Sequence, residues 1–145
     1  MKKKRLVSIF IVVVLLLTFI PTLALAQGEI FGTPREYMRI SFLNALDRGG
    51  DDQTINDYTS LALRHGAEVA LYNILFSPEF TSKDYDNSTY VEYLYKTILH
   101  RGSDPEGKAL WVGLLNSGTS RDEVFRGIVH SQEAKYIIEG HSLNV

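Results

Sequence analysis

The sequence predicts an all-α fold, a small helical domain of two pseudo-repeats that each contain about three helices and a short turn. Apolar side chains recur at the three- and four-residue spacing of amphipathic helices, and no segment alternates as a strand would. The pattern of the first half also returns 53 residues later, where Tyr37 and Asp51 correspond to Tyr90 and Asp104. A spacing shared through about ten positions indicates duplicated helical units.

Residues 1–26 have a pattern typical of an export signal. Basic residues at positions 2–5 precede an apolar run from Leu6 to Ile20, and Pro21 then ends any helix. Ala24-Leu25-Ala26 fits a signal-peptidase site, so residues 1–26 are expected to direct the protein to a secreted, periplasmic or cell-surface location. The alternative is an uncleaved membrane anchor, because the 21 uncharged residues 6–26 are about enough to cross a hydrocarbon core of ~30 Å.

Residues 27–33 form a short spacer before the expected helical domain, residues 34–145. The first repeat covers about residues 34–83. Its first helix begins at Thr33-Pro34-Arg35-Glu36, which reads as a capping box, and ends at Gly49-Gly50. A second helix is expected over about 52–64, with Gly66 as its C-cap, and a third over about 67–76. The third helix is expected to bury Val69, Leu71, Ile74 and Leu75, and Ser77-Pro78-Glu79 starts a short helical turn.

The second repeat covers about residues 87–139 and follows the same order. Its first helix has a regular apolar face, and Gly102 ends it. Asp104-Pro105-Glu106 begins the next helix, and a capping box at residues 120–123 begins the one after. Ser131 begins the final turns. The apolar face of the first helix of this repeat, the one that precedes Gly102, consists of Val91, Leu94, Tyr95, Ile98 and Leu99.

Charge and composition exclude several classes of function. Residues 1–26 carry four basic and no acidic side chains, so without them the formal net charge changes from −2 to −6. An acidic chain without clustered Lys and Arg is a poor binder of nucleic acid or anionic lipid. Because the sequence has no cysteine, disulfides, thiolate metal sites and cysteine catalysis are excluded.

A few side chains could bind a ligand. Arg48 with Asp51 and Arg101 with Asp104 form a repeated pair that would suit a carboxylate or sugar, although helix capping explains the same spacing. Trp111 could stack on a carbohydrate, although its place beside Leu110 and Leu114 favours the core. Tyr93 and Tyr72 lie off the apolar faces, so they are candidates for an exposed partner surface.

No metal, cofactor or catalytic site is predicted. The four histidines lack a ligand-like spacing, and the acidic segments lack the glycine and glutamate of an EF-hand loop. The sequence also has no nucleophile elbow and no phosphate-binding glycine loop.

Residues 90–138 resemble the bacterial family called domain of unknown function 4214. The resemblance rests on Leu99-His100-Arg101, Asp104-Pro105-x-Gly107, Trp111, Leu115-Asn116-Ser117-Gly118 and Ser131-x-Glu133. Residues 37–80 resemble a diverged second copy in which Tyr58 replaces the tryptophan. The family is similar in fold to the linker domain of phycobilisomes, occurs in exported proteins and has no established activity. The resemblance therefore implies a helical fold and an exported context, and it supplies no catalytic residue.

These observations together predict an exported, non-catalytic interaction or scaffold module of the cell envelope or the secreted fraction. Its expected partners are envelope or extracellular proteins, or a glycan, and not nucleic acid. A membrane is expected as a partner only if the signal remains uncleaved. The alternative function is a protein that binds, or acts on, cell-wall glycan.

Overall fold

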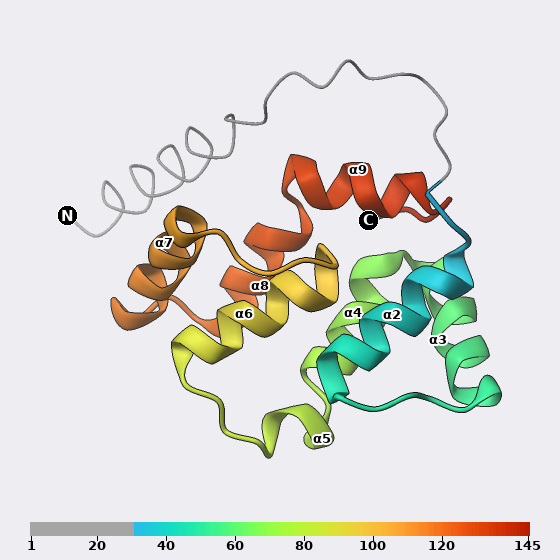
Figure 1. Ribbon diagram of the computed structural model, residues 1–145, viewed down its shortest axis with the longest axis horizontal. Coiled ribbons are helices and arrows are strands. Elements are labelled where there is room, and N and C mark those ends of the chain that lie inside the picture. The colour runs from blue at the N-terminus through green and yellow to red at the C-terminus, as the bar shows by residue number, and fades with distance from the viewer. Residues whose placement is uncertain (1–30) are drawn as a thin grey trace.

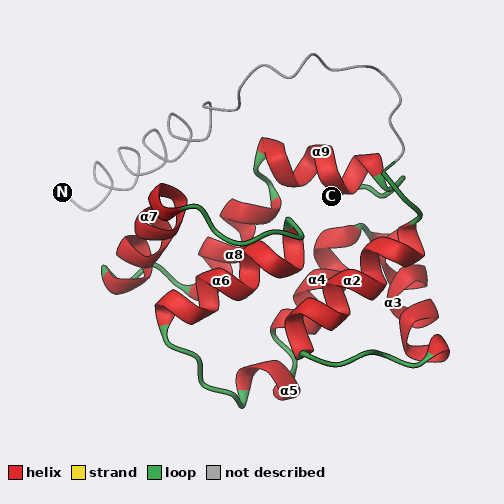
Figure 2. Cartoon of the chain, viewed as in Figure 1, coloured by secondary structure: helices red, strands yellow, loops and turns green. Residues whose placement is uncertain are grey.

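The computed structural model describes residues 31–145, and within that range it contains helices and no strands (Figure 2). This confirms the all-α prediction, while the predicted export signal lies outside the described residues. None of the described helices is long and apolar enough to span a membrane. The helices are α2 (Pro34–Leu46), α3 (Asp52–His65), α4 (Ala67–Leu75), α5 (Pro78–Thr81), α6 (Asn87–Ile98), α7 (Pro105–Asn116), α8 (Arg121–Val129) and α9 (Gln132–Gly140).

Local capping sets most helix starts. In seven of the eight described helices, the side chain of the residue before the first turn accepts a hydrogen bond from the backbone N–H three positions later, which satisfies a free donor of that turn. Ser120 and Glu123 complete the predicted capping box before α8. Thr33 accepts from the Glu36 N–H before α2. The capping residues are Thr33, Asp51, Ser77, Asp86, Asp104, Ser120 and Ser131.

The ends of α2 and α6 differ from the prediction. Asp47, with φ 55°, takes the left-handed conformation after α2, and His100, with φ 53°, takes it after α6. The glycines at 49, 50 and 102 follow these turns and do not have positive φ. The prediction that glycine ends these helices is therefore wrong, because short polar side chains such as Asp, and to a lesser degree His, tolerate this backbone region.

The helix starts recur at nearly constant spacing. Helices α6 and α7 begin 53 residues after α2 and α3, while α8 and α9 begin 54 residues after α4 and α5. The left-handed residues that follow α2 and α6, Asp47 and His100, are also 53 positions apart. The main difference is the last element, because α9 has nine residues and α5 has four.

The core lies around the closely packed pair α2 and α6, which run side by side at the centre of the molecule (Figure 1). Leu94 and Ile98 on α6 are fully buried, which confirms the predicted apolar face. In α4 the predicted Leu71, Ile74 and Leu75 are buried, whereas the predicted Val69 is 37% exposed and Ala70 is buried instead. The buried stripe of α4 starts at Ala67 and includes small alanines, which a pattern of large apolar residues does not reveal.

The last residues connect α9 to the first half of the chain. The Ala67 N–H, at the start of α4, donates to the Asn144 carbonyl at 2.7 Å. Gly66 caps α4 without a side chain, so this carbonyl satisfies a donor that the local sequence leaves free. Leu143 is buried, and the Phe31 N–H donates to the Gly140 carbonyl at 2.9 Å. Figure 1 accordingly shows the two ends of the described chain close together beside α9.

Candidate interaction surface

The two predicted arginines form matching internal ion pairs, here named the Arg–Glu clamps. Arg48 binds Glu79 through Nε and Nη2 at 2.6 and 2.7 Å, and Arg101 binds Glu133 in the same way at 2.5 and 2.7 Å. Each clamp joins the loop after α2 or α6 to the first turn of α5 or α9. The clamped carboxylates raise the pKa of both guanidinium groups, and the Arg48 contact lowers the pKa of Glu79.

Each clamp arginine also packs over an aromatic ring. The Arg48 guanidinium carbon lies 5.1 Å from the centre of the Phe42 ring, and that of Arg101 lies 5.1 Å from the Tyr95 ring. Arg48 and Arg101 further donate to the carbonyls of the glycines that follow them. A planar guanidinium suits these bidentate and stacking contacts. Both arginines are therefore committed to internal contacts.

The two predicted aspartates are helix caps. Asp51 accepts from the Thr54 N–H and Asp104 from the Gly107 N–H, each at 2.7 Å. The hydrogen bonds from Thr54 lower the pKa of Asp51, since they stabilise the carboxylate. Asp104 also lies 3.6 Å from Arg101. Helix capping therefore accounts for Asp51 and Asp104, whereas Arg48 and Arg101 are held by the Arg–Glu clamps instead of capping helix ends.

Trp111 lies inside the molecule and is 3% exposed. Its ring lies directly against Gly127 of α8, where a Cβ added to the glycine would lie 2.6 Å from Cη2 of the ring. The close approach explains why α8 carries a glycine within its helix. An indole buried in this way presents no free face to a sugar.

Tyr93 belongs to a half-buried aromatic cluster. Its ring stacks on Tyr85 with centres 4.5 Å apart, and Phe80 meets it edge-on at 5.7 Å. The Tyr93 hydroxyl donates to Asp47 at 2.6 Å and accepts from Tyr85 at 3.0 Å. The hydrogen bond to Asp47 is the main cause of a raised Tyr93 pKa. Tyr93 thus ties α6 to the end of α2, and it is less exposed than the sequence suggested.

His100 is the described histidine with the most altered environment. Its ring packs against that of Tyr37, with centres 4.6 Å apart and planes tilted by 32°, and its Nε2 lies 2.9 Å from the Ser41 hydroxyl. His141 lies 6.2 Å from it, ring centre to ring centre. Burial, with a smaller contribution from His141, lowers the pKa of His100 to about 4. Among the described residues, no cluster of three or more His, Asp and Glu side chains could hold a metal ion.

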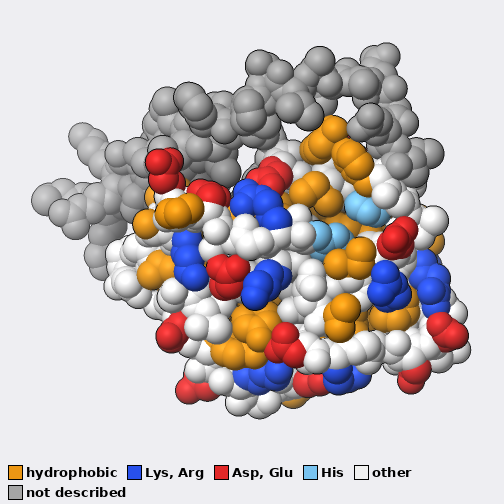
Figure 3. Space-filling model, in the orientation of Figure 1, with side chains coloured by type: hydrophobic (Ala, Val, Ile, Leu, Met, Phe, Trp, Pro, Cys, Tyr) orange, Lys and Arg blue, Asp and Glu red, His pale blue; other side chains and the backbone are white. Residues whose placement is uncertain are grey.

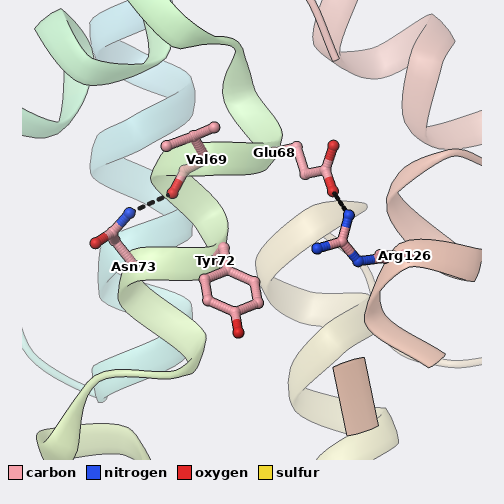
Figure 4. A pocket seen from close by; sticks show the side chains of 5 residues that line it. All are labelled: Glu68, Val69, Tyr72, Asn73 and Arg126. Atoms are coloured by element: carbon pink, nitrogen blue, oxygen red, sulfur yellow. Dashed lines mark hydrogen bonds and ion pairs between the residues drawn. The ribbon is translucent and has the colours of Figure 1, made fainter. Parts of the chain in front are cut away.

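A hollow of about 280 Å³ lies between α4 and α8, here named the α4–α8 hollow. Figure 4 shows Tyr72 from α4 and Arg126 from α8 on its two sides. Glu68 binds Arg126 at 3.0 Å and His130 at 3.1 Å, while Arg126 also binds Asp122 at 3.1 Å. The hollow is lined by Glu68, Val69, Tyr72, Asn73 and Arg126.

The α4–α8 hollow contains exposed apolar surface. Val69 and Tyr72 are each 37% exposed, and Tyr72 stacks on Phe76 with ring centres 4.2 Å apart and planes 13° apart. Phe125 meets both rings edge-on at 5.7 Å. Among the residues that line the hollow, Tyr72 is the one that the sequence predicted to belong to a partner surface. Arg126 could have been found through the repeat, because it occupies the position of the second half that corresponds to Tyr72 in the first half, 54 residues earlier.

Comparison with known proteins identifies part of the chain. Residues 71–137 match the family model described as Domain of unknown function (DUF4214). The chain carries a DUF4214 domain. No curated protein and no solved structure matches the chain.

The DUF4214 match begins earlier than the resemblance over residues 90–138 suggested. It starts within α4, includes α5 to α8 and ends within α9. Tyr72, Asn73 and Arg126 therefore lie inside the DUF4214 domain, whereas Glu68 and Val69 lie just before it. The α4–α8 hollow is thus lined partly by residues of the DUF4214 domain and partly by residues that precede it.

The geometry explains one motif of the DUF4214 domain. The Tyr95 hydroxyl occupies the space that a Cβ on Gly107 would need. At the corresponding positions of the first half, Phe42 has no hydroxyl and Thr54 stands in place of the glycine. In the Asp104-Pro105-x-Gly107 motif, Asp104 therefore caps α7 and Pro105 begins it. Gly107, which has no side chain, leaves room for the Tyr95 hydroxyl.

Proposed function

We propose that the chain is an exported, non-catalytic interaction module of the cell envelope or the secreted fraction. The α4–α8 hollow is the observation that carries this proposal, because it leaves Val69 and Tyr72 open beside a fixed ion pair. Exposed apolar side chains bordered by polar groups are typical of binding surfaces. The export part rests on the basic, apolar and Ala-x-Ala segments of residues 1–26.

The charge distribution supports a non-catalytic role. Glu68 is the one carboxylate among the described residues that line the hollow, and its two oxygens contact Arg126 and His130. A glycosidase requires two carboxyl groups facing a cleft. On the face that Figure 3 presents, acidic and basic side chains are interspersed. At the hollow itself, Glu68 and Asp122 pair with Arg126, which favours a neutral partner over a highly charged polymer.

We further infer that the two halves are copies of one unit and that the copies act as a rigid support for the binding surface. The repeated helix starts and the two Arg–Glu clamps support this inference. The clamps connect loops to helices within each half, so they fix how α5 and α9 sit against the central pair. An interaction module benefits from such rigidity because less conformational entropy is lost on binding.

The alternative of glycan binding through Trp111 loses its aromatic platform, since that ring is buried. Any glycan contact must use another aromatic side chain. The described chain offers Tyr72 and Tyr136 as large exposed rings with a polar edge.

The export proposal is tested by expressing the full-length gene in a bacterial host and fractionating the cells. Mass spectrometry of the exported protein should show a new amino terminus at Gln27. Intact Met1 in the membrane fraction would instead support a tethered protein, and an intact cytoplasmic protein would overturn export.

The interaction proposal is tested by capturing partners from the envelope and culture fractions of the producing cells with the purified protein. Specific partners should be retained by the wild type and by Tyr136→Ala, and lost with Val69→Glu and Tyr72→Ala. Tyr136 is a matched control because its ring is also exposed, at 44%, but lies on α9. Capture that is unaffected by the variants of the hollow would overturn this surface as the binding site.

A further inference from the structure

The α4–α8 hollow is an open depression that presents one fixed aromatic ring. Phe76 covers one face of the Tyr72 ring, and Phe125 holds both rings from the edge. The ring is therefore fixed in place while 37% of the residue stays exposed beside the hollow. A preorganised aromatic surface of this kind binds with little loss of side-chain freedom.

The polar groups around the Tyr72 ring have donors and acceptors that remain available to a ligand. Arg126 uses Nε for Asp122 and Nη1 for Glu68, which leaves Nη2 without a hydrogen bond to another described residue. The Asn73 amide nitrogen donates to the Val69 carbonyl of its own helix, so its oxygen can accept from a ligand. The Tyr72 hydroxyl can both donate and accept. Figure 4 shows the Arg126 and Asn73 side chains on either side of the Tyr72 ring.

The size and shape of the hollow limit what it can hold. Its volume of about 280 Å³ lies just below the range of ligand pockets, roughly 300–1,000 Å³, so only a small ligand fits. Helices α4 and α8 satisfy their own backbone groups, so an extended peptide finds no strand edge to pair with. The exposed apolar side chains of α4 are Val69 and Tyr72, too few to seat the apolar face of a partner helix.

The ligand that fits must be small, with one apolar face and a rim of hydroxyl groups. We infer that the α4–α8 hollow binds a single pyranose ring of a neutral glycan, stacked on Tyr72 and hydrogen-bonded by Arg126 and Asn73. This inference rests on the proposed function and names the ligand of the same surface. A carboxylated or phosphorylated sugar is disfavoured by Glu68 and Asp122, which already neutralise the Arg126 charge.

The test is saturation-transfer NMR with the full-length protein and three neutral probes, namely cellotriose, maltotriose and the β-1,4-linked trimer of N-acetylglucosamine. Transfer to one sugar ring of at least one probe is expected for the wild type. Tyr72→Ala should weaken binding about tenfold, in line with the loss of a central aromatic contact. Tyr72→Phe should keep the ring stacking, and Tyr136→Ala should bind like the wild type.

Asn73→Ala and Arg126→Gln provide a second test, because both side chains are exposed and neither supports the Phe76 stack. Each should weaken binding while leaving the melting temperature nearly unchanged. No transfer to any probe, or transfer that survives Tyr72→Ala, would overturn the glycan inference. If protein capture nevertheless depends on Tyr72, the interaction module stands and its occupant is a protein. If neither capture nor transfer depends on Tyr72, both proposals fail.

Discussion

Arg101 and Glu133 lie 32 residues apart and form a two-pronged ion pair that joins the end of α6 to the first turn of α9. Arg48 and Glu79 form the same pair 31 residues apart in the first half. The two clamps differ in exposure, since the side chain of Arg101 is 39% exposed and that of Arg48 is 52% exposed. Ion pairs gain strength as solvent is excluded, so the two clamps should differ in energy.

A double-mutant cycle with Arg101→Gln and Glu133→Gln should give a coupling free energy of about 1 kcal/mol in urea unfolding. The cycle of Arg48→Gln and Glu79→Gln should give a smaller coupling, because that pair is more exposed. Both couplings should shrink in high salt. A larger coupling in the first half would show that exposure does not set the strength of the clamps.

Gly127→Ala should destabilise the protein by about 1–3 kcal/mol, because the added methyl group meets the Trp111 ring. Gly113→Ala is the matched control, since Gly113 also lies within a helix and a Cβ added there meets nothing within 4 Å beyond its own helix. That change should stabilise by up to about 1 kcal/mol through helix propensity. Thermal or urea unfolding measures both, and equal effects would contradict the close Trp111 packing.

Stability should fall as the pH decreases from about 6.5 to 4 because of His100. Burial lowers the folded-state pKa of His100 to about 4, so the unfolded chain takes up the proton first. The loss should reach up to about 3 kcal/mol and should be absent above pH 7. The measurement is urea unfolding of the wild type and His100→Asn across this range, since Asn tolerates the positive φ at this position. Parallel pH profiles for the two proteins would exclude His100 as the cause.

Thr97→Val should raise the free energy of unfolding by about 1 kcal/mol. The Thr97 hydroxyl is buried without a hydrogen-bond partner among the described residues, and valine has nearly the same shape without the polar group. Thr59→Val serves as the control, because the Thr59 hydroxyl donates to the Ile55 carbonyl at 2.7 Å. The control variant should gain no stability. A loss of stability in Thr97→Val would mean that the hydroxyl is satisfied in solution.

Leu94→Ala and Ile98→Ala should each cost about 2–5 kcal/mol, as large-to-small changes in a packed core do. Both side chains are fully buried between the central helices. Leu43→Ala tests an exposed leucine of α2, at 41%, and should change stability far less. Wild-type melting temperatures for both core variants would contradict the central position of α6.

Sequence by itself determined where the helices begin and the all-α class. A cap acts within three residues, so Asp104 or Ser120 can be recognised without knowing what lies elsewhere in the chain. The face of α6 was equally predictable, because large apolar residues repeat at helical spacing. The recurrence of the helix starts from the first half to the second also follows from the sequence pattern alone.

Only the tertiary structure decided which side chains meet across the fold. It paired Arg101 with Glu133, placed Trp111 against Gly127, and turned Val69 outward while Ala70 went into the core. It also brought Tyr72 and Arg126 together at the α4–α8 hollow. These contacts depend on how helices pack in three dimensions, whereas the capping and periodicity rules describe only neighbours along one helix.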